Sequence, residues 1–168
     1  MNTTPIPRRL WPAYPNFKKG NRISPSIKAR HLCTFRKFTQ RVESNTVFLS
    51  IDFSDACKDI SDCIDRCVRE CGLQCVRVDQ LEYCGSIPDQ IAKQINGCRV
   101  MIADVTRSNP NVLFEIGLAC QAAKDIIVIC HSEAEPPFSL RHINTIRYCY
   151  LYELEPQLRK RLKAILTK

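Results

Sequence analysis

Between residues 46 and 167, short apolar runs alternate with longer amphipathic segments, and this alternation restricts the fold more than any other feature of the chain. The apolar runs predict strands at 47–51, 74–78, 99–103, 126–130 and 143–148. The amphipathic segments predict helices at 55–71, 87–95, 112–123 and 156–167. Strands that alternate with helices of this length are typical of right-handed βαβ units. We therefore predict an α/β, flavodoxin-like open parallel sheet of about five strands, in the order 2-1-3-4-5, with helices on both faces.

The stretch VMIADVTRSNPNVLFEIGLA, at 100–119, is the leading candidate for a functional site. A buried-strand pattern runs directly into Asp104, a turn rich in Asn and Pro follows, and a helix pattern then carries Glu115 among apolar neighbours. A glutamate in such surroundings is costly unless it is exposed, paired or used. Open α/β sheets bind their ligands just beyond the carboxyl ends of the strands. The pattern therefore predicts a site that holds both carboxylates and a small, polar ligand.

The predicted strand order places the ligand crevice between the first and third strands, where the order reverses. The loops that follow these two strands span 52–55 and 104–111, and both are acidic or polar. We expect Asp52, Asn109 and Asn111 to contact the ligand from these loops. Arg77 and Asp79, at the end of the second strand, are either further ligand groups or an ordinary solvated pair.

The chain has no phosphate-binding loop of the GxxxxGK[ST] type, no GxGxxG and no GxSxG elbow, which weakens phosphoryl transfer, dinucleotide redox chemistry and serine hydrolysis. Near a helix N-terminus, Glu115 is expected to stay ionised unless it is desolvated. An ionised carboxylate below a sugar ring can stabilise an oxocarbenium-like transition state or attack it, while a second acid protonates the leaving group. Asp104 is the candidate for that second role. Alternatively, Asp104 only pins its loop and Glu115 is an exposed helix residue.

Positive charge is concentrated at the start of the chain. Residues 1–45 hold ten Lys or Arg and one acid, a net +9, whereas the rest holds 15 basic and 16 acidic residues, a net −1. Five prolines within 1–28 and the lack of an apolar period indicate an extended or disordered arm. We divide the chain into a basic N-terminal extension, 1–45, and an α/β domain, 46–168. The extension has the composition of a nucleic-acid or anionic-surface contact, and the alternative is a solvated tail.

The eleven cysteines do not resemble a disulfide framework. Cys63, Cys67 and Cys71 are four residues apart and interleave with apolar residues on one predicted helical face. Free cysteine behaves as a small buried hydrophobe, so we expect reduced, largely buried thiols in a cytoplasmic protein. Paired CxxC knuckles are missing and the three histidines are scattered, so no metal is expected. No apolar run reaches the ~18–20 residues that a membrane span requires.

Five blocks between residues 47 and 148 resemble, in order and spacing, the nucleoside 2-deoxyribosyltransferase-like domains, and among them the TIR-like predicted nucleotide-binding proteins of bacteria. The blocks are VFLSIDFSD, GLQCVRVDQ, IPDQIAKQINGCRVMIADVT, NPNVLFEIGLACQAAKDIIVI and PPFSLRHINTIRY. The segment NPNVLFEIGLA is the most specific part of the resemblance. Residues 1–45 lie outside it.

In the transferases, the glutamate of this segment is the nucleophile that takes up the deoxyribosyl group, and in TIR-type relatives a comparable glutamate supports cleavage of the nicotinamide–ribose bond of NAD. The resemblance implies that role for Glu115, base handling for Asp104, and nucleotide contacts by Phe53 and Arg141. It implies a nucleotide-binding N-glycosidase that cleaves the base–ribose bond of NAD or a nucleoside phosphate without a cofactor, and it is compatible with a homo-oligomer. The alternative is a non-catalytic nucleotide sensor or binding module.

Overall fold

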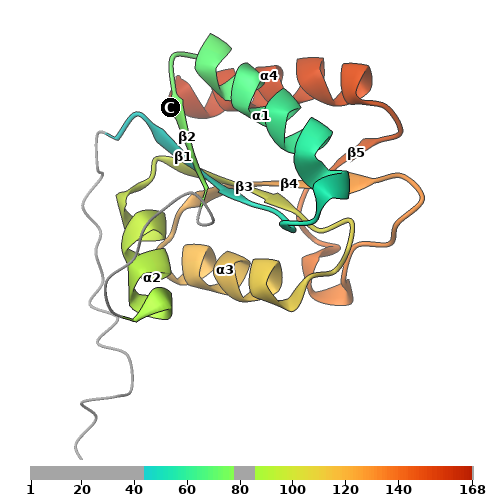
Figure 1. Cartoon of the computed structure of the whole chain (residues 1–168). Helices are drawn as coiled ribbons and strands as arrows, with labels where there is room; N and C mark the ends of the chain where they lie inside the picture. Colours follow the sequence, from blue (N-terminus) through green and yellow to red (C-terminus); the bar gives the residue numbers. More distant parts are fainter. Residues whose placement is uncertain (1–43, 78–85, 168) are drawn as a thin grey trace, which may run out of the picture. The chain divides into compact units, whose positions relative to one another are not determined.

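A computed structural model describes residues 44–77 and 86–167, and these residues contain a five-stranded sheet in the order β2-β1-β3-β4-β5. All four neighbouring strand pairs are parallel (Figure 1). The strands are β1 (Thr46–Ser50), β2 (Gln74–Arg77), β3 (Val100–Asp104), β4 (Asp125–His131) and β5 (Ile146–Tyr148). The flavodoxin-like strand order predicted from the sequence is confirmed.

Helices cover both faces of the sheet, as the alternation predicts (Figure 1). The helices α1 (Lys58–Glu70) and α4 (Leu151–Leu166) pack on one face, which we call the α1/α4 layer. The helices α2 (Ile87–Gly97) and α3 (Pro110–Gln121) pack on the other, the α2/α3 layer. Two short 3-10 helices, η2 (Asp55–Cys57) and η4 (Phe138–Leu140), lie in the connecting loops.

Each layer has its own core, because successive residues of a strand point to opposite faces of the sheet. In β3, Val100 and Ile102 belong to the α1/α4 core, whereas Met101 and Ala103 belong to the α2/α3 core. All five residues of β3 are buried, as expected for a central strand covered on both sides. This alternation decides which layer each polar side chain at the strand ends enters.

A glycine ends α1 where the sequence places the helix end. Gly72 has a φ of +76°, in the left-handed region that favours glycine. The backbone N–H of Leu73 donates to the carbonyl of Val68 at 3.1 Å, and that of Gly72 donates to Arg69 at 2.9 Å. This pair of bonds is the Schellman arrangement, which satisfies carbonyls at a helix C-terminus.

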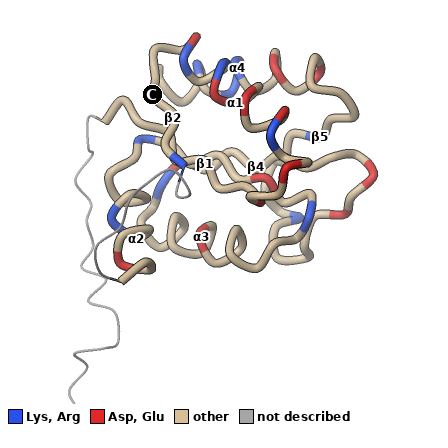
Figure 2. Tube along the Cα trace, in the orientation of Figure 1, with Lys and Arg blue, Asp and Glu red and all other residues tan. Residues whose placement is uncertain are grey.

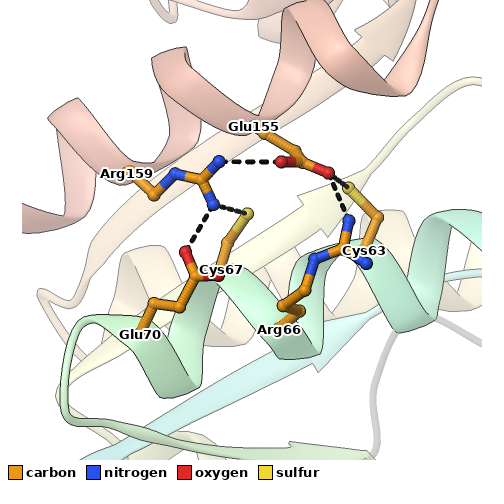
Figure 3. Close-up of polar contacts among 6 residues, drawn as sticks. All are labelled: Cys63, Arg66, Cys67, Glu70, Glu155 and Arg159. Atoms are coloured by element: carbon orange, nitrogen blue, oxygen red, sulfur yellow. Dashed lines mark hydrogen bonds and ion pairs between the residues drawn. The ribbon is translucent and has the colours of Figure 1, made fainter.

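A polar network joins α1 to α4 along their exposed edges (Figure 3). The carboxylate of Glu155 on α4 accepts hydrogen bonds from Arg66 on α1 and, at 2.7 Å, from Arg159 on its own helix. Arg159 also pairs with Glu70 near the end of α1. Two thiols of α1 lie beside these charges, Cys63 and Cys67. The network ties together the two helices of one layer.

Several element boundaries differ from the prediction, and two of these differences have a clear physical cause. The last helix begins at Leu151 rather than at Pro156, which lies inside α4. An internal proline costs about 3 kcal/mol, but burial of a leucine stabilises by about 1.5–3 kcal/mol, and Leu154, Leu158 and Leu162 are all buried. The predicted strand 143–148 is shortened to Ile146–Tyr148, because Ile143 still belongs to the turn after η4, where its N–H donates to a carbonyl.

The predicted extension 1–45 lies outside the described residues except for its last two positions, 44 and 45. Asp79 lies outside them altogether.

The nine cysteines that are described are all free: five are buried, two are half-buried, and Cys120 and Cys149 are exposed. Within 44–77 and 86–167, no group of three His, Cys, Asp or Glu side chains could hold a metal ion. In the same two segments, no helix has the length and apolar character needed to cross a membrane.

Candidate functional site

The carboxyl group of Glu115 is buried against the sheet in the α2/α3 layer. Only 6% of the residue is exposed. The hydroxyl of Ser50, the last residue of β1, donates a hydrogen bond to Glu115 Oε2. Burial raises the pKa of Glu115 above its ordinary value, and the Ser50 hydrogen bond offsets part of that rise. The alternative in which Glu115 is merely an exposed helix residue is therefore wrong.

The sequence of α3 explains why Glu115 faces inward. Val112, Ile116 and Ala119 are buried, and Glu115 falls with them at the i, i+3, i+4 and i+7 spacing of one helical face. Asn109 is the N-cap of α3 and fixes where the helix begins, because its side chain accepts the N–H of Asn111 at 2.9 Å. The apolar residues of this face pack onto the sheet, so the Glu115 carboxyl is buried with them. Asn111 itself is exposed.

Asp104 lies in the opposite layer. The alternation along β3 directs its side chain to the α1/α4 layer, where it is 7% exposed. Its Oδ1 accepts the backbone N–H of Thr106 at 2.9 Å and the Thr106 hydroxyl at 2.5 Å. Burial raises the pKa of Asp104, and the Thr106 hydrogen bonds oppose that rise. The structure therefore does not bring Asp104 and Glu115 together on one face of the sheet, and it shows Asp104 pinning its own loop.

The loops after β1 and β3 do meet, as the switch-point argument predicts. Asn109 Nδ2 donates to Asp52 Oδ1 at 3.3 Å, and Arg107 Nε lies 3.7 Å from Asp52 Oδ2. Asp52 thus joins the two loops at the carboxyl edge of the sheet. Arg107 was not among the residues predicted from the sequence, although a basic residue in a predicted ligand loop was a usable signal. Ser50 was also missed. The only indication in the sequence is that a serine ends an apolar strand at a position that faces the same side of the sheet as Phe48.

A cavity of about 280 Å³ opens beside these loops in the α1/α4 layer. The cavity is lined by the loop after β1, by η2 and the start of α1, by the end of β3 and the loop after it, by the last residues of β4 and β5, and by the first residue of α4. Its lining includes Asp52, Asp59, Ile60, Asp104, Arg107 and Leu151. Glu115 does not line this cavity.

The remaining predicted residues are dispersed. Phe53 is 52% exposed in the loop after β1. Arg77 lies against α1, where it donates to the hydroxyl of Ser61. Arg141 is exposed, 3.9 Å from a carboxylate oxygen of Glu135, with its guanidinium 5.8 Å from the centroid of an aromatic ring in η4. No hydrogen bond or ion pair joins any of these three side chains to Glu115 in the described part of the chain.

The topology defines the molecule as an α/β protein with a flavodoxin-like parallel sheet and a buried carboxylate on its third helix. The chain is similar to the CMP N-glycosidase BcmB from Clostridium botulinum, with a TM-score of 0.56 and 21% identity over 69% of this chain and 98% of that one. It is also similar to the TIR domain of the Toll-related receptor TRR-2 from Hydra magnipapillata, with a TM-score of 0.58 and 12% identity over 74% and 99% of the two chains. The resemblance noted in the sequence is thus confirmed at the level of the fold. No protein-family model matches the sequence, and a search of the curated proteins gives no match.

Proposed function

We propose that this protein is an N-glycosidase that cleaves the base–ribose bond of a nucleotide, either NAD or a nucleoside phosphate, with Glu115 as the catalytic carboxylate. The observation that carries the proposal is the buried Glu115 carboxyl, which is oriented by Ser50 near the carboxyl edge of the sheet. The fold supports it, because a CMP N-glycosidase has the same fold. The exposed Phe53, in the loop after β1, and the exposed Asn111, in the first turn of α3, are proposed contacts for the nucleotide.

The geometry suggests how Glu115 would act. Ser50 holds Oε2, which leaves Oε1 to face the anomeric carbon of the sugar. As the glycosidic bond breaks, its electron pair leaves with the base, and the carboxylate stabilises or captures the oxocarbenium-like sugar. Water then adds to that carbon and displaces the Glu115 carboxylate where a glycosyl ester has formed. The proton that the water loses goes to the departed base of a nucleoside phosphate, or to solvent in the case of NAD, whose nicotinamide leaves as a neutral molecule. Asp104 takes no part in this scheme, because its side chain lies in the opposite layer.

A panel of NAD and nucleoside phosphates, read by release of free base, tests the proposal. We expect the intact chain to release base from at least one member, and Glu115→Gln to reduce the rate by about 10²-fold or more, as for other groups that stabilise a developing charge. Asp62→Asn is the matched control, because Asp62 is an exposed acid on α1 and should not affect the rate. Equal activity of the wild-type protein and Glu115→Gln would exclude Glu115 as the catalytic group.

The pH profile gives a second readout of the same proposal. Glu115 must be ionised to act on the sugar, so the rate falls as pH drops below the raised pKa of this carboxyl. The Ser50 hydrogen bond holds that pKa down, so Ser50→Ala should move the acid limb of the profile to higher pH. An acid limb that stays in place would contradict the assignment of the limb to Glu115.

The alternative is a nucleotide-binding module without turnover. Similarity to a receptor's TIR domain favours it, since that neighbour is named as part of a receptor. A ligand that binds only the native state raises the melting temperature. The same nucleotide panel therefore separates the two functions: thermal stabilisation without released base supports the binding module, and stabilisation with released base supports the enzyme.

A further inference from the structure

We propose that Asp52 is a positioning residue for the catalytic carboxylate: it ties the start of α3 to the loop after β1 and so keeps Glu115 aligned with Ser50. The proposal rests on the function proposed above, and it adds a residue that the reaction requires without placing that residue on the substrate. Three observations carry it: the hydrogen bonds around Asp52, the backbone of the loop before α3, and the electrostatic surroundings of Glu115.

Asp52 is joined directly to the N-cap of α3. The side-chain amide of Asn109 makes two hydrogen bonds at once: its Oδ1 accepts the backbone N–H of Asn111 at 2.9 Å, and its Nδ2 donates to Asp52 Oδ1 at 3.3 Å. The first bond caps the helix, and the second ties that cap to the loop after β1. Ser50 ends β1 and donates to Glu115. The same stretch of chain therefore holds α3 at its N-cap and again at its buried carboxyl.

The Asp52 carboxylate is itself held from two sides. Its Oδ2 accepts a hydrogen bond from the Ser54 hydroxyl at 3.4 Å and lies 3.7 Å from Arg107 Nε. Ser54 belongs to the same loop as Asp52, whereas Arg107 belongs to the loop after β3. The Arg107 side chain is 49% exposed, and an ion pair as exposed as this one contributes little to stability. We therefore assign these contacts to the orientation of Asp52 toward Asn109.

The loop between β3 and α3 contains a strained residue and is pinned at both ends. Ser108 has a φ of +50°, in the left-handed region that a serine rarely adopts. A residue keeps such a conformation only where its surroundings fix it. Asp104 fixes the beginning of this loop through Thr106. Asp52 fixes its end through Asn109. Loss of the Asp52 contact would therefore release the strained loop at the end that joins α3.

Asp52 acts on Glu115 through position and not through charge. Burial raises the pKa of Glu115 and the Ser50 hydrogen bond lowers it, and in the part of the chain that the structure describes no charged group contributes to this shift. Without the Asp52 contact, α3 could shift along the sheet while Val112 and Ile116 stay buried. Glu115 would then keep its burial and lose its alignment with Ser50. The pKa of its carboxyl would therefore rise.

A carboxyl ¹³C NMR titration of the intact chain measures that pKa directly, with Glu115→Gln to assign the signal. We expect Asp52→Ala to raise the pKa of Glu115 toward the value found in Ser50→Ala. When Asp52→Ala is added to Ser50→Ala, no further rise is expected, because both changes act on the same hydrogen bond. Asp55→Ala is the matched control, since Asp55 is an exposed acid in η2, and it should leave the pKa of Glu115 unchanged.

Steady-state kinetics separate positioning from contact with the substrate. Asp52→Ala should lower kcat about tenfold or more with little change in KM, because it misplaces the reacting group without removing a binding contact. Asp52→Asn keeps an oxygen that can accept from Asn109 and should restore most of kcat. Asn109→Ser keeps a capping oxygen but loses the donor to Asp52, so it should act as Asp52→Ala does even if that variant folds poorly.

Four outcomes would overturn the proposal. They are a pKa of Glu115 that is unchanged or lowered in both Asp52→Ala and Asn109→Ser, a further rise when Asp52→Ala is added to Ser50→Ala, an increase in KM at constant kcat, and an equal effect of Asp55→Ala. The NMR titration needs no turnover. A chain that releases no base would thus contradict the proposed function, whereas the role of Asp52 in placing the carboxyl would still be decided by the pKa of Glu115.

Discussion

At the level of single residues, Glu115 occupies a position where packing alone would favour an apolar side chain. It lies in the same buried stripe of α3 as Val112 and Ile116. A carboxyl group there is desolvated, and its main described partner is the hydroxyl of Ser50. Such positions are typical of functional sites, where stability is given up for chemistry.

Glu115→Gln should therefore stabilise the fold at neutral pH. The pKa of Glu115 is raised in the folded state, so stability is full at low pH and is lost as pH rises through that raised pKa. Gln keeps an oxygen for Ser50 and cannot ionise. We expect the free energy of unfolding to rise by about 0.5–2 kcal/mol at pH 7, the usual gain from a stabilising substitution. The gain should be smaller at acid pH. Urea titrations at both pH values measure it, with exposed Glu133→Gln as the control; a loss at pH 7 would contradict the argument.

The sequence identifies Glu115 from its apolar neighbours and its place after a strand. It does not reveal Ser50, because that contact joins residues 65 positions apart and depends on the register of β1 against β3. It also does not reveal that Asp104 and Glu115 face different layers. That separation can be inferred only when β3 is known to include Asp104 as its last residue. The side chain of Asp104 then points to the same face of the sheet as those of Val100 and Ile102.

At the level of elements, α1 and α4 are joined both by apolar packing and by the charged network at their edge (Figure 3). Figure 2 shows the charged residues of these two helices in one part of the trace. Glu155 is central to the network, because it accepts from Arg66 and Arg159. Its pKa is lowered, first through the hydrogen bond from Arg66.

Glu155→Gln should lower the melting temperature slightly at neutral pH. A lowered folded-state pKa means that the contribution of Glu155 is present above its ordinary pKa and disappears as pH falls through the lowered one. The difference between the variant and the wild-type protein should thus vanish in acid and shrink at high salt. Thermal scans at two pH values and two salt concentrations measure this. A difference that persists in acid would show that side-chain packing, not charge, is responsible.

Helices and strands were predicted in number and order, but their ends were less predictable. Gly72 marks the end of α1 correctly, because glycine readily adopts the positive φ, here +76°, that ends a helix, and this preference is local. Pro156 marks the start of α4 incorrectly. The upstream turn is stabilised by Glu153, whose carboxylate accepts the backbone N–H groups of Cys149 and Tyr150 at 2.9 and 3.3 Å. That cap and the buried leucine face outweigh the local rule for proline.

At the level of the whole molecule, the parallel sheet follows from the alternation of elements and from the handedness of βαβ units. Five strands then favour the flavodoxin-like order among the doubly wound orders, and the structure has that order. The division of the cysteines between core and surface was not predictable, since it depends on packing. Burial raises the pKa of the Cys63 and Cys75 thiols to about 12, which makes them poor nucleophiles.

Alkylation of the native protein should therefore reach only a few thiols. We expect iodoacetamide to modify the exposed Cys120 and Cys149 first, and the five buried thiols only after denaturation. Site-resolved mass spectrometry of native and denatured samples measures this for the nine described cysteines. Extensive labelling of the core thiols in the native protein would contradict their burial. A variant with Cys120 and Cys149 replaced by serine is the control, because it should lose the rapid modification.

The basic extension allows a test at the same scale. Deleting residues 1–28 should leave the melting temperature unchanged, because no predicted strand or amphipathic helix begins there. If the extension contacts nucleic acid, binding should weaken steeply with added salt and vanish in the truncated protein. If binding is retained after truncation and does not depend on salt, the nucleic acid contacts a part of the chain other than residues 1–28.

The opposite orientation of neighbouring residues in β3 also determines how the chain can change through mutation. A substitution in α3 alters the surroundings of Glu115 while Asp104 lies across the sheet, so the two layers can diverge separately. Insertion or deletion of one residue within β3 is different, because a shift of one position turns every side chain of the strand to the other face. Point substitutions can thus alter one layer at a time, whereas a change in the length of this strand disrupts both layers.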